Sequence, residues 1–561
     1  MRNYFLAHRH LFLWLGILSL LLLTLATQRN HNTGSDPRGI LLVSQVLVQE
    51  GAVKLDSLGE PLLQGYGYVV YRKNGHFYHV FPLGSALLAA PAVAIANAAG
   101  IDMRQHEHSM QMILVAFCAI GIILLHYRMA RIDLGRTESL GMAALGWFGT
   151  SYASTLGTAF WSHDPAVLFA SLAIYLALRK RRFAGEAALI GACLFLAYLC
   201  RPTLALLAPA LLLFLLSKNW KIAAGAALAL GLLLAAFVLW SFHEFGQPLP
   251  DYYLPKRLEG SHFPTALYGN LFSPARGLLV YTPFLLLPIL FLPLLLWKQK
   301  KHLPLLILTL LWPLLHYLAV SRFPHWWGGY SYGPRLMVDV LPGLLLGIFP
   351  CLALLKKRKK MRTPILAFMV VLGAFSIFVH TCQGLYNVYT AQWNAAPDID
   401  KYPEFLFDWR FPQFLNSKRR QRERMRRFYQ QSLPPCKARC AIAYDAPHAG
   451  FDGFYGLEDG MRWSEGTAAR LSFKLEDASK LSGLLSLQAG FLDYQRLTIY
   501  LNGTLVFKGA YHGGERDIRI QAPNLLRTGL NRLDFALPDA HAPGTADPRI
   551  LGMAFRHLAI D

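Results

Sequence analysis

Residues 222–240 read IAAGAALALGLLLAAFVLW and carry no charged side chain. A helix of roughly 20 apolar residues crosses the hydrocarbon core of a bilayer, which is about 30 Å thick. Helices satisfy their backbone hydrogen bonds internally, so they are the form that such a run takes in lipid. This stretch therefore predicts a transmembrane helix, and it sets the fold class that we expect for the chain around it.

Apolar runs of the same kind recur on both sides of this stretch, as far as residue 382. The chain is 54% hydrophobic and 16% charged, whereas an ordinary soluble domain has about 25% charged residues. We therefore expect an α-helical polytopic membrane protein with about eleven transmembrane helices in residues 1–382. The predicted spans are residues 11–27, 109–127, 139–160, 165–178, 185–200, 202–217, 221–243, 278–297, 303–321, 340–355 and 363–382.

The net charge of +22 is not gathered in one soluble patch, so it does not indicate nucleic-acid binding. Basic clusters instead fall in every second loop between the apolar runs. Short loops rich in Lys and Arg stay in the cytoplasm. The pattern predicts a cytoplasmic N-terminus and an extracytoplasmic C-terminus. The clusters are Arg128–Arg136, Arg179–Arg182, Lys218–Lys221, Lys298–Lys301 and Lys356–Lys360.

On this topology, residues 28–108, 244–277 and 322–339 form large loops on the outer side. The first of them contains a further apolar run, Phe81–Ala99. If that run crossed the membrane, the Arg128–Arg136 cluster would lie on the wrong side. We therefore expect Phe81–Ala99 to form a juxtamembrane or re-entrant helix.

Beyond the last span, residues 383–450 read as a basic linker and residues 451–561 as an all-β domain. Short stretches of alternating apolar and polar residues, separated by turn signals, predict a β-sandwich of the jelly-roll kind. The stretches are Ala469–Leu475, Leu497–Leu501 and Asp517–Ile520, and the turn signals are Asn502-Gly503, Gly513-Gly514 and Pro543-Gly544.

Two features of the linker carry their own expectations. Residues 418–427 hold seven basic side chains, which suit either a solvated connecting helix or a helix lying on anionic lipid headgroups. Cys436 and Cys440 lie four apart outside the spans, with no His or Cys close in sequence to complete a zinc site. An extracytoplasmic pair of this kind is a candidate disulfide.

Polar residues near a membrane are costly and usually functional. Arg201, Arg276 and Arg335 carry permanent positive charge and forked donors that match phosphate. Asp36 and Asp164 are carboxylates suited to act as a general base or to orient a histidine or a metal ion. The predicted topology puts all five on the outer side.

The same outer loops hold flat aromatic side chains of the kind on which sugar rings stack. Cations for phosphate, carboxylates for deprotonation and aromatics for sugar together suit glycosyl transfer from a lipid-phosphate donor. The expected substrate-binding residues are Arg38, His163, His325, Trp326, Trp327, Tyr330 and Tyr332.

Each of these groups also has a structural interpretation. Asp36-Pro37-Arg38 suits a loop turn with a local ion pair. His163-Asp164-Pro165 suits a helix N-terminus, with Asp164 as the cap. Residues 326–332 suit an interfacial aromatic belt, and Arg201 suits a snorkelling side chain.

A first helix, an outer Asp within about ten residues of it, an apolar stretch opened by HVFPLG (79–84) and an outer HDP (163–165) before a span follow one another in an order that resembles the GT-C superfamily of membrane glycosyltransferases. This superfamily includes protein O-mannosyltransferases and the aminoarabinose transferase that acts on lipid A. The resemblance covers about residues 1–400, and the tail resembles a periplasmic β-sandwich carried by some bacterial members. The motifs NLFSPARG (270–277) and WGGYSYGPR (327–335) resemble a bacterial branch of the superfamily, and the resemblance of the tail rests on GLEDGMRWS (456–464) and DPRILG (547–552).

The resemblance implies an enzyme of the bacterial inner membrane that moves a sugar, with inversion, from a polyprenyl-phosphate donor to a periplasmic acceptor. The acceptor would be a cell-envelope glycan, lipid or protein. Asp36 matches the catalytic acid of the first outer loop, and Asp164 matches the acid of the second. Many members carry two adjacent acids in the first loop, whereas Pro37 follows Asp36 here. This departure weakens the expectation of a divalent cation, Mg²⁺ or Mn²⁺, held by Asp36 and Asp164.

Two other classes of protein remain open on the sequence. A transporter of lipid-linked sugars would share the spans and the phosphate-binding arginines, but it would need neither an outer aspartate nor a bulky folded tail. A membrane scaffold that displays a carbohydrate-binding sandwich would need no catalytic residue. Substituting Asp36 would stop an enzyme and leave either alternative working.

Overall fold

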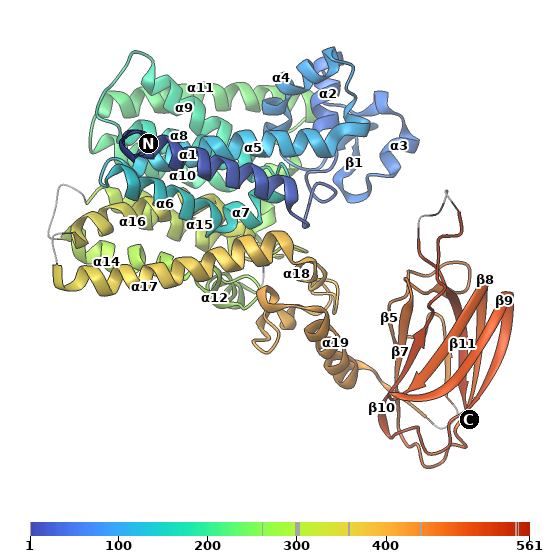
Figure 1. Ribbon diagram of the computed structural model, residues 1–561. Helices are drawn as coiled ribbons and strands as arrows, with labels where there is room; N and C mark the ends of the chain where they lie inside the picture. The colour runs from blue at the N-terminus through green and yellow to red at the C-terminus, as the bar shows by residue number, and fades with distance from the viewer. Residues whose placement is uncertain are drawn as a thin grey trace. The chain divides into compact units, whose positions relative to one another are not determined.

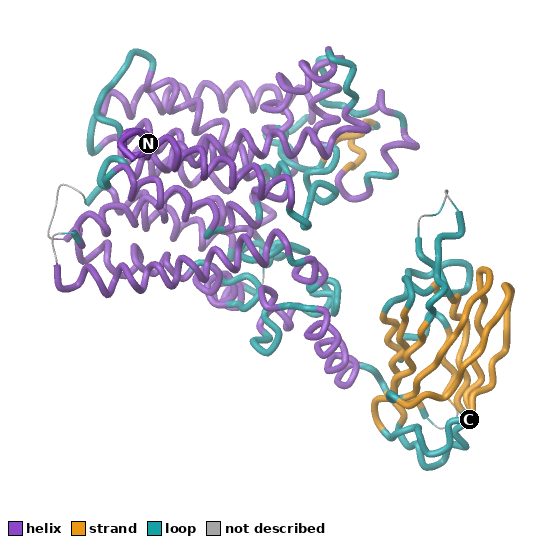
Figure 2. Tube along the Cα trace, in the orientation of Figure 1, coloured by secondary structure: helices purple, strands orange, loops and turns teal. Residues whose placement is uncertain are grey.

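The computed structural model describes residues 2–260, 262–297, 303–356, 359–437, 440–544, 547 and 549–561. The chain forms two compact units, Met1–Lys418 and Arg419–Asp561. Helices make up the first unit, whereas strands dominate the second (Figures 1 and 2). A helical region followed by a β-rich domain is the arrangement that the sequence predicts.

Five segments of the first unit are long and apolar enough to cross a membrane, as judged within the described ranges. Six further apolar helices have 10–17 residues, so the expected count of eleven spans is not confirmed. The five long segments are His10–Thr27, Met103–Ala130, Trp220–Phe245, Arg335–Leu355 and Arg362–Tyr386, and the shorter ones are Ile40–Glu50, Gly84–Ala98, His163–Leu178, Glu186–Cys200, Pro202–Leu216 and Ile307–Val320.

Two of the predicted spans are interrupted. The helix in 139–160 ends at Phe148, because Gly149 caps it and Thr150 starts a new short helix by accepting a hydrogen bond from the backbone N–H of Tyr152. The run 278–297 breaks at Thr282-Pro283 for a different reason: proline has no backbone N–H with which to continue the helix. The α-helices of this unit are α1 (Arg2–Thr27), α2 (Ile40–Glu50), α3 (Glu60–Gln64), α4 (Gly84–Ala98), α5 (Met103–Ala130), α6 (Arg136–Phe148), α7 (Ser151–Ser154), α8 (His163–Leu178), α9 (Glu186–Cys200), α10 (Leu207–Leu216), α11 (Trp220–Phe245), α12 (Phe263–Phe272), α13 (Leu278–Tyr281), α14 (Leu286–Trp297), α15 (Trp312–Val320), α16 (Leu341–Leu355), α17 (Lys359–Ile377) and α18 (Val388–Gln392).

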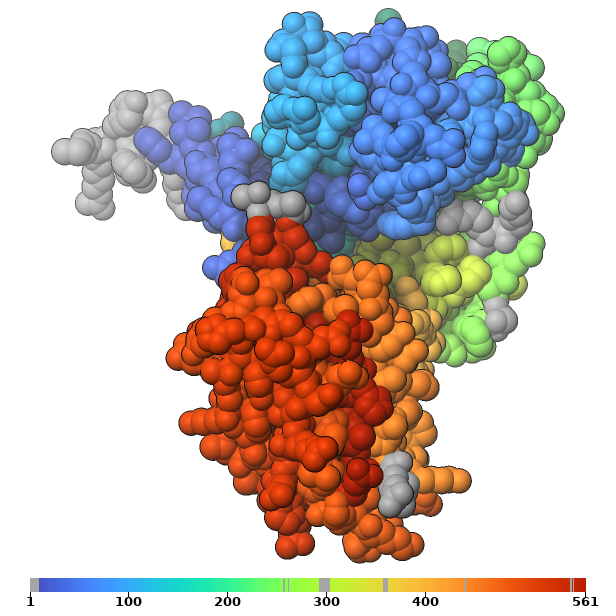
Figure 3. All heavy atoms as spheres, turned by 90° about the vertical axis from the view of Figure 1, so that its right-hand side faces the viewer, coloured from blue at the N-terminus to red at the C-terminus, as the bar shows by residue number. Residues whose placement is uncertain are grey.

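The first expected outer loop folds into helices α2–α4 and a small hairpin of β1 (Val70–Lys73) and β2 (His76–His79). These elements gather at one end of the helical bundle (Figure 1), and their atoms form a continuous blue surface in Figure 3. Two contacts bind the hairpin to the second outer loop: Lys73 Nζ lies 2.8 Å from Asp251, and the Tyr78 hydroxyl lies 2.9 Å from Glu244. Residues 28–108 and 244–277, both expected as outer loops, therefore pack against each other.

Helix α19 (Lys418–Ser432) begins at the boundary between the units, and all its residues after Lys418 belong to the second unit. A nine-stranded sheet follows the helix. The strand order is β3-β7-β10-β8-β11-β4, with β5 beside β7, β6 beside β11 and β9 beside β8. The strands are β3 (Pro435–Cys436), β4 (Cys440–Ala443), β5 (Ala449–Asp452), β6 (Arg462–Trp463), β7 (Ala468–Leu475), β8 (Leu484–Leu501), β9 (Thr504–Gln521), β10 (Gly529–Ala536) and β11 (Met553–Ile560).

The long strand β8 connects the two parts of this sheet. Residues 485–491 pair with β11, and residues 498–501 pair with β10. Apolar side chains from β7 and β10 meet those of β11 and β4 in a single cluster, which includes Phe473, Phe535 and Phe555. The sheet therefore folds around one core.

The turn signals of the tail have different outcomes. Asn502-Gly503 forms the tight turn between β8 and β9, with positive φ at both residues. Gly513-Gly514 is no turn, which corrects the sequence interpretation: two residues of β8, Leu492 and Asp493, lie opposite Gly513. The β-bulge is therefore in β8, and the two glycines lie opposite it inside β9 with positive φ angles. The turn predicted at Pro543-Gly544 would include residues 545 and 546, which lie outside the described residues.

Residues 383–450, expected as a linker, are divided between the two units. Residues 383–418 pack on the helical unit because buried polar side chains fasten them there. Asn394 and Gln413 each donate a hydrogen bond to the carbonyl oxygen of Ser331, over 3.1 Å in both cases. Arg419 and the residues that follow it belong to the β-rich unit.

Candidate functional site

Asp36 and Arg335 meet at the end of the helical bundle, although 299 residues separate them in sequence. Asp36 lies in the turn between α1 and α2, and Arg335 begins the helical segment that leads into α16. An Arg335 guanidinium N–H donates to one carboxylate oxygen of Asp36, and the Tyr68 hydroxyl donates to the other over 2.9 Å. Both oxygens of Asp36 are therefore engaged.

The electrostatic balance at Asp36 favours the carboxylate. Burial by itself would raise the pKa of Asp36, but the positive charge of Arg335 and the hydrogen bonds from Arg335 and Tyr68 outweigh it and hold this pKa below its ordinary value. Asp36 is therefore ionised at neutral pH. While Arg335 holds it, it is a weak proton acceptor.

A small cavity of about 20 Å³ adjoins this pair. It has room for about one water molecule and none for a sugar. The guanidinium of Arg335 stacks on Trp161, with 4.1 Å from its central carbon to the ring centroid. A larger ligand therefore has to displace Arg335 or its neighbours. The lining residues are Asp36, Pro37, Ile40, His79, Phe81, Pro82, Ser85, Phe160, Trp161, Ser162, Arg201 and Arg335.

Glu107 of α5 fixes the turn that carries Asp36. Its carboxylate accepts hydrogen bonds from the backbone N–H of Gly39, over 2.8 and 3.0 Å, and from that of Leu41, over 3.2 Å. Gly39 has a φ of +83°, which side chains other than glycine rarely allow. Because Glu107 satisfies free N–H groups at the start of α2, it also stabilises that helix.

Behind the cavity lies a buried network centred on Asp339. Its carboxylate accepts from the Thr203 hydroxyl over 2.8 Å and contacts His163 Nδ1 at 2.6 Å and Arg201 Nε at 3.5 Å. Arg201 also donates to the Tyr252 hydroxyl over 3.3 Å. Asp339 thus offsets part of the charge of Arg201, whose side chain lines the cavity beside Asp36.

Asp164 does not join Asp36. It is fully buried in the first turn of α8, whose N-cap is Ser162, so the expectation that Asp164 caps this helix is wrong. No hydrogen-bond partner of its carboxylate oxygens is present in the described part of the chain. An acid in a first helical turn is stabilised by the helix dipole. Asp164 is absent from the residues that line the Asp36 cavity.

Arg276, expected to bind phosphate, is buried with all its side-chain N–H groups engaged, so in this conformation it offers no free donor to a phosphate. Its side chain is 1% exposed and donates five hydrogen bonds. Burial lowers its pKa to about 10, so it stays charged at neutral pH. The acceptors are the backbone oxygens of Ala275, Trp327 and Gly329 and the side-chain oxygens of Asn394 and Gln413, over 2.7–3.0 Å.

We expect Arg276→Gln to destabilise the protein by about 3–5 kcal/mol, because the substitution leaves several buried acceptors without their donor. The apparent melting temperature in detergent should fall clearly. Arg72→Gln is the matched control, since Arg72 is exposed on β1 and should tolerate the change. An Arg276→Gln protein as stable as the control would contradict the structural role.

Most of the expected sugar-stacking aromatics are buried. Trp326 lies against Gly269 so closely that a Cβ there would fall 2.1 Å from its ring. Trp327 donates to Asp400 over 2.7 Å, and Tyr332 donates to the Val379 carbonyl over 2.7 Å. Stacking by these three is therefore not possible in this conformation.

Of the other expected substrate contacts, His163 is fully buried, whereas Tyr330, His325 and Arg38 remain accessible in part. Tyr330 is 51% exposed, and His325 is also exposed. Arg38 is partly exposed, and its guanidinium packs over Tyr66 with 4.4 Å to the ring centroid.

A second cavity, of about 300 Å³, was not expected from the sequence. Amide, hydroxyl and imidazole groups make up about half of its lining, and Arg29 contributes a cation. The polar run Arg29–Asn32 directly after the first span is the signal that could have indicated it. The lining residues are Arg29, Asn30, His31, Asn32, Ser154, Tyr330, Ser331, Tyr332, Gly384, Val388, Thr390, Ala391, Gln392 and Asn394.

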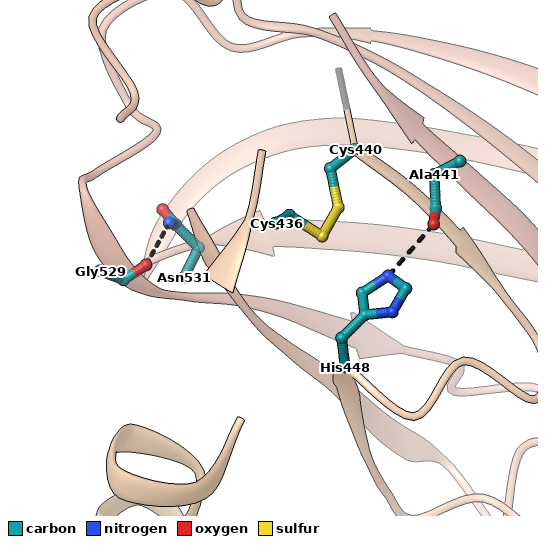
Figure 4. Close-up of a disulfide and its surroundings, with 6 residues drawn as sticks. All are labelled: Cys436, Cys440, Ala441, His448, Gly529 and Asn531. Carbon is teal, nitrogen blue, oxygen red and sulfur yellow. Dashed lines mark hydrogen bonds between the residues drawn. A yellow bond between two sulfur atoms is a disulfide. The ribbon is translucent and has the colours of Figure 1, made fainter. Parts of the chain in front are cut away.

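In the β-rich unit, Cys436 and Cys440 form a disulfide between β3 and β4 (Figure 4). His448 lies beside it, and its Nε2 is 3.2 Å from the carbonyl oxygen of Ala441. The two sulfurs and a His448 nitrogen lie within 4.8 Å of one another. Both sulfurs are bonded to each other, so this group holds no metal ion in its disulfide form.

No protein-family model and no curated protein matches this chain. Among solved structures, it is similar to an oligosaccharyltransferase of Archaeoglobus fulgidus tethered to an acceptor peptide, with 13% identity, 72% of this chain and 60% of that chain covered, and a TM-score of 0.42. An acetyl xylan esterase from Butyrivibrio proteoclasticus gives 10% identity, 22% and 32% coverage and a TM-score of 0.17.

A family 43 arabinoxylan arabinofuranohydrolase from Bacillus subtilis gives 11% identity, 23% and 28% coverage and a TM-score of 0.15. This chain thus spans less than two thirds of the length of each of these three proteins. At such TM-scores the similarities assign neither a fold family nor an activity.

Proposed function

We propose that this chain is a membrane glycosyltransferase of the GT-C type, which moves a sugar from a polyprenyl-phosphate donor to an extracytoplasmic acceptor. The observation that supports the proposal most is the contact between Asp36 and Arg335. It joins a carboxylate able to accept a proton to a cation able to bind phosphate, at the end of a bundle of apolar helices.

The donor phosphate competes with Asp36 for Arg335. A phosphate group can accept both N–H groups of a guanidinium fork, so it is a suitable replacement for the carboxylate. Arg201 lines the same cavity and adds positive potential there. Once the phosphate neutralises Arg335, the pKa of Asp36 rises toward its ordinary value, and Asp36 becomes a better base.

The transfer then follows from the groups in place. Asp36 takes the proton of an acceptor hydroxyl, and that oxygen attacks the anomeric carbon from the face opposite the phosphate. The bond between the anomeric carbon and the phosphate oxygen breaks, and its electron pair leaves with the polyprenyl phosphate. Arg335 stabilises the negative charge that grows on this leaving group.

The larger polar cavity is the site that we assign to the acceptor. Its lining residue Asn32 precedes Asp36 by four residues, a distance of at most about 14 Å along an extended chain. The backbone N–H of Ser35 bonds to the Asn32 carbonyl over 3.0 Å, so the true separation is shorter. Hydroxyl, amide and Tyr330 groups suit a saccharide, and an acceptor bound there would reach Asp36.

The residues around Asp36 do not suit a divalent cation. Arg335 and Tyr68 occupy the two carboxylate oxygens, and Asp164 does not line the cavity. Within the described ranges, the only group of three possible ligands that lie together is Cys436, Cys440 and His448 in the other unit. No step of the proposed transfer therefore uses a metal ion.

The test is glycan and glycolipid analysis by mass spectrometry in a strain that lacks this protein. We expect one envelope glycan or glycolipid to lose a sugar while its lipid-linked donor accumulates. Wild-type protein should restore the product, and correctly inserted Asp36→Asn protein should not. Full restoration by Asp36→Asn would favour a transporter of lipid-linked sugars or a scaffold instead.

A further inference from the structure

One face of α19 is fastened to the β-rich unit. Tyr429 donates a hydrogen bond to Asp452 over 3.0 Å, and its ring lies against Gly450, where a Cβ would fall 2.4 Å from the ring. Phe428 and Arg424, four residues apart on the helix, are also buried. The orientation of α19 about its own axis is therefore fixed relative to strand β5.

The exposed side chains of α19 include three arginines, Arg419, Arg422 and Arg426, which we call the basic stripe; Tyr429 continues the same side of the helix one turn further on. Their spacing of three and four residues puts them on one side of the helix. Within the described part of the chain, none of these three side chains forms an ion pair. The one acid within α19, Glu423, is paired with Arg427 over 3.1 Å, so it does not neutralise the stripe.

We propose that the basic stripe binds the anionic headgroups of a membrane surface. Charge complementarity is the first reason, because three unpaired cations extend over about 10 Å along the helix, which is enough to contact several lipid headgroups. The second reason is location: α19 belongs to a chain that five long apolar helices can anchor in a bilayer. The stripe has no apolar side chain between its arginines, so the binding is electrostatic and involves no insertion.

The size of the effect follows from the number of charges. Each basic residue close to an anionic surface contributes about fivefold to the affinity, so the three together contribute about 100-fold. Added salt weakens such binding, because the Debye length falls from about 10 Å at 0.1 M to about 3 Å at 1 M.

The experiment uses the full chain reconstituted in nanodiscs of phosphatidylcholine, which supply no anionic lipid of their own. Separate vesicles of phosphatidylcholine, with or without about 30% phosphatidylglycerol, are added, and co-flotation measures binding. We expect binding only to the anionic vesicles, with loss near 1 M salt. The triple variant Arg419→Gln, Arg422→Gln, Arg426→Gln should bind about 100-fold more weakly.

A matched control removes the same charge elsewhere on the β-rich unit. Lys508, Arg519 and Arg527 are exposed on that unit, and their triple substitution by Gln should leave binding within about threefold. Equal loss in both variants would overturn the proposal, because net charge alone would then explain the binding. Unchanged binding in the stripe variant would also overturn it.

Discussion

Asp36→Asn is expected to lower turnover by about 100-fold or more while the affinity for the donor rises. The loss follows from removing the general base, which contributes roughly 10²–10⁴-fold in enzymes. The gain follows from the ion pair with Arg335, since an amide competes for the guanidinium far less well than a carboxylate. The measurements are single-turnover transfer of labelled sugar and equilibrium binding of the polyprenyl-phosphate donor.

This combination separates catalysis from structure. A variant that merely misfolds would lose both turnover and donor binding. Asp56→Asn is the matched control, because Asp56 is also an acid of the first outer segment and is paired with a base, His76, at 3.0 Å. Asp56 lies outside both cavities, so near-normal turnover is expected. An Asp36→Asn protein with near-normal turnover would refute the assignment of the base.

The sequence predicts the two kinds of unit because both depend on local patterns. Apolar runs such as residues 222–240 need only hydrophobicity and length to form helices. The β8–β9 hairpin needs only alternation and the Asn502-Gly503 turn, where both residues adopt positive φ. Gly513-Gly514 carries the same local signal, yet it continues strand β9 opposite a bulge of β8, because the pairing with β8 decides its structure.

The roles of the arginines could not be predicted in this way. Arg276 and Arg335 are the same type of residue, and each follows a short loop motif that contains aromatic residues. The sequence therefore gives both the same expected role. Only the folded chain brings Asn394 and Gln413 onto Arg276, from a region that the sequence indicates as a linker. Asp36 and Arg335 find each other by the same kind of long-range contact. Composition identifies the candidate residues, whereas packing decides which of them remain available to a ligand.

The aromatic residues give the same lesson about burial. Trp326 and Tyr330 belong to one aromatic segment, residues 326–332, and are equally suited to a sugar by chemistry. Trp326 fills the space over Gly269, which a side chain at that position would occupy, whereas Tyr330 projects from the loop. The cavity beside Tyr330 could not be predicted, because nothing in the sequence indicates that residues 384–394 lie close to residues 29–32.

Arg335→Gln is expected to weaken donor binding by about 100-fold, because truncating one partner of a buried charge contact typically costs 2–5 kcal/mol and each 1.4 kcal/mol is tenfold. Arg335→Lys keeps the charge without the fork, so its affinity should lie between that of Gln and wild type. Arg72→Gln, on the exposed face of β1, is the control and should bind the donor normally.

The same substitution has a second, independent consequence for pH dependence. Arg335 holds the pKa of Asp36 below its ordinary value, so without Arg335 burial dominates and the pKa rises. Asp36 must be ionised to act as a base, and the acid limb of kcat/KM reports its pKa in the free enzyme. This limb should therefore move to higher pH in Arg335→Gln, whereas wild type keeps its activity further into the acid range. An unchanged acid limb together with weaker donor binding would mean that another group, and not Asp36, takes the proton.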